Sequence, residues 1–215
     1  MIQLVLIALS FLVALTIHEF AHAWTADKLG DPNPKLAGRL TLNPLAHLDP
    51  LGTVVLPLFL ILSGSPIVFG WAKPVVIDVF NFRNLRRDTG LVSLAGPAAN
   101  FGLAGAFAIL LRLARLPLNP AGSIVYQVIF LIIINNVSLG FFNLLPIHPL
   151  DGGKAIVGFL PRETAYKIDE FLNQYGQILL IFLIFPFFGR SLISYLLSPI
   201  INFFLNLLLP SYPLI

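Results

Sequence analysis

Long apolar runs, separated by short polar stretches, dominate the chain of 215 residues. A helix needs about 20 apolar residues to cross the hydrocarbon core of a bilayer. Runs of that order predict membrane helices over residues 2–26, 90–116, 122–146, 171–188 and 191–209. No polar block is long enough for a separate module, so the pattern predicts a single membrane-embedded domain over 1–215.

One further apolar run, 51–70, has a different character. Three residues in it disfavour a continuous straight helix: Pro57, Gly64 and Pro66. The flanking stretches 27–50 and 71–88 are both basic, and the positive-inside rule assigns both to the cytoplasm. We therefore favour a re-entrant segment that enters and leaves on one side. The alternative is an ordinary crossing with one basic loop outside.

Two loop segments have the composition of short strands. They are "GRLTLNPLAHLDP" (38–50) and "GWAKPVVIDVFNF" (70–82), both rich in β-forming residues and turn residues. We predict short strands or a β-hairpin at the membrane surface. The fold class expected is an all-α multi-pass membrane protein with additional helices and short surface β-hairpin loops.

Composition agrees with a membrane protein and narrows its partners. The chain is 57% hydrophobic and only 11% charged, whereas soluble domains average about 25% charged residues. The net charge of +3 comes from loops between apolar runs, which indicates membrane orientation and excludes nucleic-acid binding. No cysteine is present, so a thiolate metal site is excluded.

The first apolar run carries three ionisable side chains in "FLVALTIHEFAHAW" (11–24). Residues four apart lie on one face of a helix, so His18 and His22 can bind one zinc ion. Glu19 lies on the edge of that face, where a carboxylate can act as the general base of a metalloprotease. Such five-residue matches occur by chance in soluble helices. Within a membrane helix, however, a carboxylate costs a few kcal/mol and is rarely without function.

A catalytic zinc site needs a third protein ligand. Most of the ten acidic residues lie in basic loops, but Asp151 is flanked by apolar sequence on both sides. The alternative for Asp151 is a helix N-cap. His148 is a candidate third ligand, a partner of a ligand, or an interfacial histidine. His47 is interpreted as a loop histidine near the interface.

Three motifs together carry a family resemblance. "HEFAH" (18–22), "AGPAANF" (95–101) and "NLLPIHPLDGG" (143–153) resemble the site-2 intramembrane metalloproteases. The resemblance covers about residues 10–160 and is to the small prokaryotic type without a PDZ or CBS module.

The resemblance implies a three-helix catalytic core over 2–26, 90–116 and 122–152. It also implies one Zn²⁺ per chain and these site residues: His18, His22 and Asp151 as zinc ligands, Glu19 as catalytic base, and Asn143 and Asn100 as substrate-binding asparagines. For Asn100 the alternative is an interhelical hydrogen bond.

The implied activity is intramembrane hydrolysis of peptide bonds in transmembrane helices of other proteins. His18 lies about 24 Å along the first helix at 1.5 Å per residue, so the site is expected within the cell membrane near the cytoplasmic face. A metal transporter and a non-catalytic scaffold are the alternatives. A transporter does not need Glu19 as a base, so Glu19→Gln should spare transport but abolish proteolysis. A zinc-free protein that still binds its partner would favour the scaffold.

Overall fold

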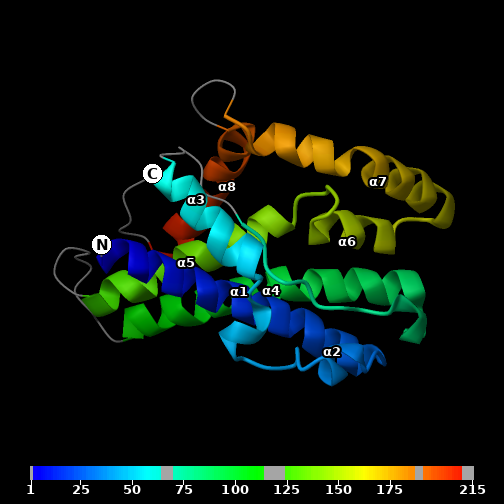
Figure 1. Cartoon of the computed structure of the whole chain (residues 1–215), viewed down its shortest axis with the longest axis horizontal. Helices are drawn as coiled ribbons and strands as arrows, with labels where there is room; N and C mark the ends of the chain where they lie inside the picture. Colours follow the sequence, from blue (N-terminus) through cyan, green and yellow to red (C-terminus); the bar gives the residue numbers. More distant parts are fainter. Residues whose placement is uncertain (1, 64–69, 114–123, 187–190, 210–215) are drawn as a thin grey trace.

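Three long helices form the centre of the protein. The computed structural model describes residues 2–63, 70–113, 124–186 and 191–209, and in those ranges it contains helices and loops but no strand. The helices that are long and apolar enough to cross a membrane are α1 (Ile2–Leu29), α4 (Leu85–Leu113) and α5 (Ile124–Asn143). Figure 1 shows them packed along a common direction. The prediction of an all-α membrane protein is confirmed.

Helix α4 packs against both α1 and α5, and α1 also contacts α5. Small side chains make part of this contact possible, because Ala104 and Ala108 of α4 are buried against Ile133 and Val137 of α5. Lipid tails are as apolar as leucine, so helices in a bilayer associate mainly through close packing and polar contacts. The α1–α4 interface therefore tolerates, and uses, the polar side chains described below.

Beyond α5, helical structure is interrupted at positions where the hydrophobicity of the sequence predicts a continuous helix. The predicted core helix over 122–152 ends at Asn143 in the described residues, and its first two positions lie outside them. Pro146 and Pro149 follow, and both disfavour a continued helix because proline lacks the backbone N–H. Helix α6 (Asp151–Phe159) begins after this turn and packs against α4.

Two C-terminal helices complete the fold. Helix α7 (Arg162–Ile184) starts nine residues before the predicted 171, because its first half is polar and forms no apolar run. It contacts α6 and α8 (Leu192–Leu208). The last predicted positions of the 171–188 helix lie partly outside the described residues, as does the end of the 90–116 helix.

Where it is described, the connection between α1 and α4 contains short helical elements. They are α2 (Asn33–Leu36), η1 (Pro44–His47), η2 (Pro50–Val55), α3 (Leu56–Leu62) and η3 (Val79–Asn81). The predicted surface strands are wrong for the described residues. Arg39 is buried and its guanidinium donates to the carbonyls of Ala46, Lys73 and Pro74, so a side chain takes up carbonyls that a strand would have paired.

The two ends of the apolar run 51–70 lie next to each other. It begins as η2 and α3, and residues 64–69 lie outside the described part of the chain. The N–H of Trp71 then donates to the carbonyl of Gly52 at 3.2 Å, and the hydroxyl of Thr53 donates to the carbonyl of Trp71 at 2.7 Å. The two ends of this run are therefore held side by side.

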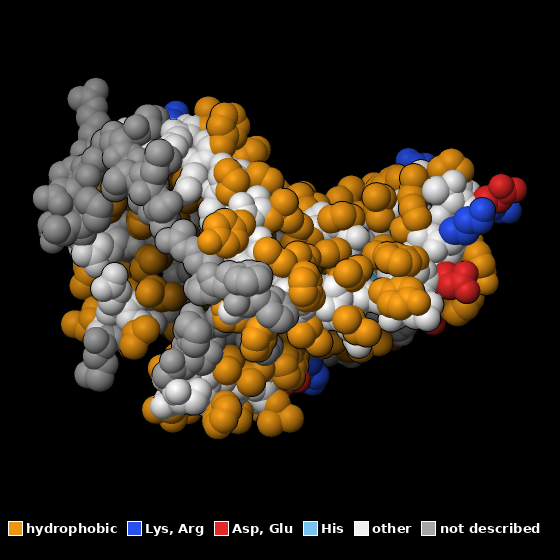
Figure 2. Space-filling model, turned by 90° about the horizontal axis from the view of Figure 1, so that it is seen from above, with side chains coloured by type: hydrophobic (Ala, Val, Ile, Leu, Met, Phe, Trp, Pro, Cys, Tyr) orange, Lys and Arg blue, Asp and Glu red, His pale blue; other side chains and the backbone are white. Residues whose placement is uncertain are grey.

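The surface matches a lipid environment. Figure 2 shows hydrophobic side chains over most of the described surface on that face, with charged groups gathered toward the end where α7 begins. The same end of the molecule holds the last turn of α1 and the first turn of α4 in Figure 1. The described surface on this face is thus mostly apolar, with most of its charged groups toward one end.

Candidate metal centre

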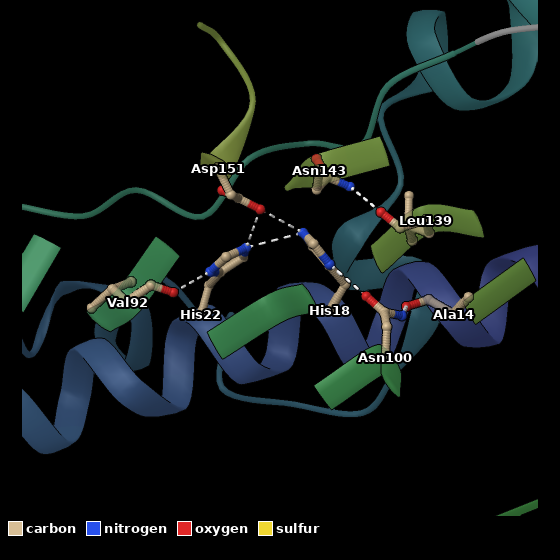
Figure 3. A network of polar contacts seen from close by, with 8 residues as sticks. All are labelled: Ala14, His18, His22, Val92, Asn100, Leu139, Asn143 and Asp151. Carbon is tan, nitrogen blue, oxygen red and sulfur yellow. Dashed lines mark hydrogen bonds and ion pairs between the residues drawn. The ribbon is translucent and has the colours of Figure 1, made fainter. Parts of the chain in front are cut away.

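Helix α1 brings His18 and His22 together on one face. They are one helical turn apart, both are buried, and their Nε2 atoms lie 3.0 Å from each other. The rings meet edge to face, with an angle of 84° between their planes. Figure 3 shows both imidazoles directed toward the start of α6.

Asp151, the first residue of α6, completes the group. Its Oδ2 lies 3.0 Å from Nε2 of His18 and 3.1 Å from Nε2 of His22. The N-cap of α6 is Leu150, so Asp151 does not serve as the N-cap that was the alternative reading. The two following glycines allow this placement. A Cβ at Gly152 would lie 2.2 Å from the carbonyl oxygen of Leu144, so only glycine lets α6 begin this close to the preceding turn.

The other nitrogen of each imidazole is held by α4. Nδ1 of His18 lies 2.6 Å from Oδ1 of Asn100, and Nδ1 of His22 lies 2.7 Å from the carbonyl oxygen of Val92. Both partners accept hydrogen bonds, so each imidazole carries its proton on Nδ1. Each Nε2 then presents a lone pair to the centre of the group.

Gly96 makes room for the imidazoles. A Cβ at this position would lie 2.5 Å from Nε2 of His22 and 2.7 Å from Cε1 of His18. Atoms not bonded to each other do not approach so closely, since optimal carbon contacts are about 3.5–4.0 Å. The absence of a side chain at Gly96 is thus a requirement of the site.

Glu19 and Asn143 lie at the border of the group. Glu19 is half-buried, and within the described residues its carboxylate forms no hydrogen bond or ion pair with the protein. Asn143 is also half-buried, and its amide donates to the carbonyl of Leu139 at 3.0 Å. Both side chains retain oxygens that the described protein does not use.

Comparison with known proteins agrees with this geometry. Residues 117–184 match the model of peptidase family M50. The chain is 38% identical to "Putative zinc metalloprotease YwhC" of Bacillus subtilis over 91% of its own length and 85% of the relative's. It is 35% identical to "Putative zinc metalloprotease Rip2" of Mycolicibacterium smegmatis, over 86% of the chain and 69% of the relative. The chain belongs to peptidase family M50.

This is the family of the site-2 proteases, so the resemblance drawn from the motifs is confirmed and the protein is a zinc metalloprotease. A more distant relative, "Zinc metalloprotease MJ0392" of Methanocaldococcus jannaschii, is 27% identical over 52% of the chain and 32% of its own length. No solved structure matches the chain.

The donor set fits the zinc of an M50 enzyme. Ligand atoms of His18, His22 and Asp151 all lie within 4.8 Å of one another. Two imidazole nitrogens and a carboxylate oxygen meet there at 3.0–3.1 Å, and in the neutral imidazoles with Nδ1–H both nitrogens offer lone pairs. Without a cation such donors repel one another. Two histidines and one carboxylate are also the ligand types of thermolysin-like zinc sites.

The remaining histidines lie elsewhere. His148 pairs through Nε2 with Asp169 of α7 at 2.9 Å and does not belong to the metal-binding group. His47 is fully buried in η1, with Nε2 bonded to the carbonyl of Thr41. The pairing with α7 differs from all three interpretations of His148 and supports a role in holding the turn before Asp151.

Asn100 joins α4 to both α1 and α5. It is fully buried, and its amide donates to the carbonyl of Ala14 and to Oδ1 of Asn136 while its oxygen faces His18. These contacts are those of the interhelical alternative, and the substrate-binding role of Asn100 stays a prediction. The sequence did not predict the role of Val92, because this residue binds His22 through its backbone carbonyl and no sequence motif marks such a contact. Asn136 lies seven residues before Asn143, and this spacing puts both on one face of α5.

Proposed function

We propose that the protein is an intramembrane endopeptidase that hydrolyses peptide bonds within transmembrane helices of other membrane proteins. One observation carries this proposal. Two of the three donors of the zinc site, His18 and His22, lie in α1, a helix apolar enough to cross the membrane, and both are buried within the helical bundle. A metalloprotease whose site is built into such a helix meets substrates in the bilayer rather than in water.

We further propose that the chain crosses the cell membrane several times with the site near the cytoplasmic face. Basic residues at the end of α1 and at the start of α4 support this orientation, namely Lys28, Arg86 and Arg87. The meeting of Gly52 with Trp71 supports a re-entrant segment over 51–70, because a crossing segment would bring its ends to opposite surfaces.

His18, His22 and Asp151 would hold the zinc ion, which when bound supplies a polarised water and a Lewis acid for the scissile carbonyl. Glu19 would take the proton of the attacking water and give it to the leaving amine. Its unpaired, half-buried carboxylate supports this role. Asn143, at the border of the site, would donate to the substrate backbone or to the developing oxyanion.

A helical substrate must unwind before hydrolysis, and the segment 70–78 offers it a partner. The backbone N–H groups of Val75, Val76 and Ile77 form no hydrogen bond with the described protein, and Val76 is 64% exposed. Ile77 packs on the cluster that contains Val92, the residue bonded to His22. An unwound substrate strand can pair with this edge. Val76→Pro should slow cleavage at unchanged zinc content, and unchanged cleavage would count against the pairing.

The deciding experiment compares wild type with Glu19→Gln in proteoliposomes that contain a single-span protein substrate. We expect about one zinc per chain in both proteins, cleavage within the span by wild type, and loss of cleavage in the variant. Equal zinc without cleavage by wild type, but with binding of the spanning protein, would support the scaffold. Zinc flux that survives Glu19→Gln would support the transporter.

A further inference from the structure

A series of hydrogen bonds between buried side chains extends from His18 across three helices. Oδ1 of Asn100 lies 2.6 Å from Nδ1 of His18, and Nδ2 of Asn100 donates to Oδ1 of Asn136 at 2.8 Å. Asn100 belongs to α4 and Asn136 to α5, and both are 0% exposed. The series therefore links the centre of the site to a helix that contributes none of the three donor atoms.

Two backbone carbonyls determine the direction of every bond in this series. The amide of Asn136 donates to the carbonyl of Ile132 at 2.8 Å, which leaves its oxygen to face Asn100. The amide of Asn100 donates to the carbonyl of Ala14 at 2.9 Å, which leaves its oxygen to face His18. Carbonyl oxygens only accept, so neither amide can flip without losing a bond. His18 must then donate from Nδ1, and its neutral imidazole has the lone pair on Nε2.

We propose that Asn136 is a positioning residue for the metal site, acting through Asn100 on the tautomer and orientation of His18. This inference rests on the proposed zinc site. Both hydrogens of the Asn100 amide are used, one on Ala14 and one on Asn136. If the acceptor on Asn136 is removed, one buried N–H loses its partner. That loss is costly inside a protein and is relieved only by rotation of the amide away from His18.

The adjacent residue provides a matched control. Asn135 also links α5 to α1, since its amide donates to Oγ of Ser10 at 2.7 Å. It makes no contact with Asn100 or His18 among its described hydrogen bonds. Asn135→Leu and Asn136→Leu thus remove the same chemical group from the same helix, and each breaks hydrogen bonding to another helix. Only the second interrupts the series to His18.

The test is the zinc dissociation constant of the full chain in detergent, measured by competition with a chelator of known affinity. We expect Asn136→Leu to weaken zinc binding about tenfold, the lower end for partners of metal ligands. Asn135→Leu should bind zinc as wild type does, even if its melting temperature falls equally. Asn136→Asp should restore affinity, because a neutral carboxyl keeps both an acceptor and a donor. Wild-type affinity in Asn136→Leu, or equal weakening in both leucine variants, would overturn the proposal.

A second readout is independent of zinc and of cleavage. The ¹⁵N shifts of histidine in zinc-free protein distinguish the two tautomers, and the chain has only four histidines to assign. We expect a single Nδ1–H tautomer for His18 in wild type and in Asn135→Leu, and a mixture in Asn136→Leu. A mixture in wild type would refute the positioning role. A wild type that shows the single tautomer but binds no zinc would refute the proposed function instead.

Discussion

Replacing Gly96 by alanine gives a direct test of the site geometry. The new Cβ would lie 2.5 Å from Nε2 of His22, 2.7 Å from Cε1 of His18 and 2.8 Å from Nδ1 of His18. Neither ring is the free end of a flexible side chain. His18 is held by Asn100, and His22 by the carbonyl of Val92. The clash can be relieved only if α4 moves away from α1 or if an imidazole leaves its partner.

The size of the effect follows from these distances. Ordinary contacts are about 3.5–4.0 Å, so the atoms must separate by about 1 Å. Overpacking of this kind costs about 1–3 kcal/mol. If the whole cost reduces the free energy of zinc binding, the affinity for zinc falls roughly 5- to 150-fold. Misplacing reacting groups by about 1 Å also costs on the order of 10² in rate. Cleavage should therefore fall at least as far as zinc affinity.

The assay is chelator competition for zinc together with cleavage in proteoliposomes. Gly102→Ala and Gly105→Ala are the matched controls, because nothing lies within 4 Å of a Cβ at either position of the same helix. These variants should keep full zinc affinity and gain about 0.5–1 kcal/mol of stability, since alanine favours a helix over glycine. A Gly96→Ala protein with wild-type zinc affinity would show that α1 and α4 do not meet as described.

Three further outcomes are expected. Asp31→Ala should lower the melting temperature, because this fully buried carboxylate accepts from the backbone of Asp78 and from the amide of Asn81, each at 2.8 Å; an unchanged melting curve would contradict these bonds. Asp169→Asn should weaken the hold of α7 on His148 and raise proteolytic nicking of the 144–150 turn more than Glu170→Gln does. Removing zinc with a chelator should abolish cleavage and lower the melting temperature of wild type, whereas Asp151→Ala should show no such shift.

The sequence predicted the membrane helices because apolar length is a direct consequence of bilayer thickness. The predictions were wrong where another interaction determined the backbone conformation. The helix expected over 122–152 stops at Asn143 because of the prolines that follow. The surface strands expected in 38–50 and 70–82 do not form in the described residues. Instead, the guanidinium of Arg39 donates to the carbonyls of Lys73 and Pro74, a long-range contact that no local sequence pattern predicts.

The donor set was predictable because its spacing is local or its surroundings are unusual. His18 and His22 are one helical turn apart, and Asp151 is a carboxylate between apolar stretches. The groups behind the donors were not predictable in the same way. Val92 acts through a carbonyl that every residue has, and the role of Asn136 depends on which helices pack together. Knowledge of the α1–α4–α5 contacts was needed to find both.

The site and the contact between α1 and α4 are one structure. The bonds that orient the imidazoles, from Asn100 to His18 and from Val92 to His22, also join the two helices, and Gly96 sets how closely they approach. In a bilayer no hydrophobic force draws helices together, so such contacts carry much of the association. A substitution in the site should then lower both zinc affinity and stability. Stability must therefore be measured on zinc-free protein, because bound zinc would add its own contribution only to variants that still bind it.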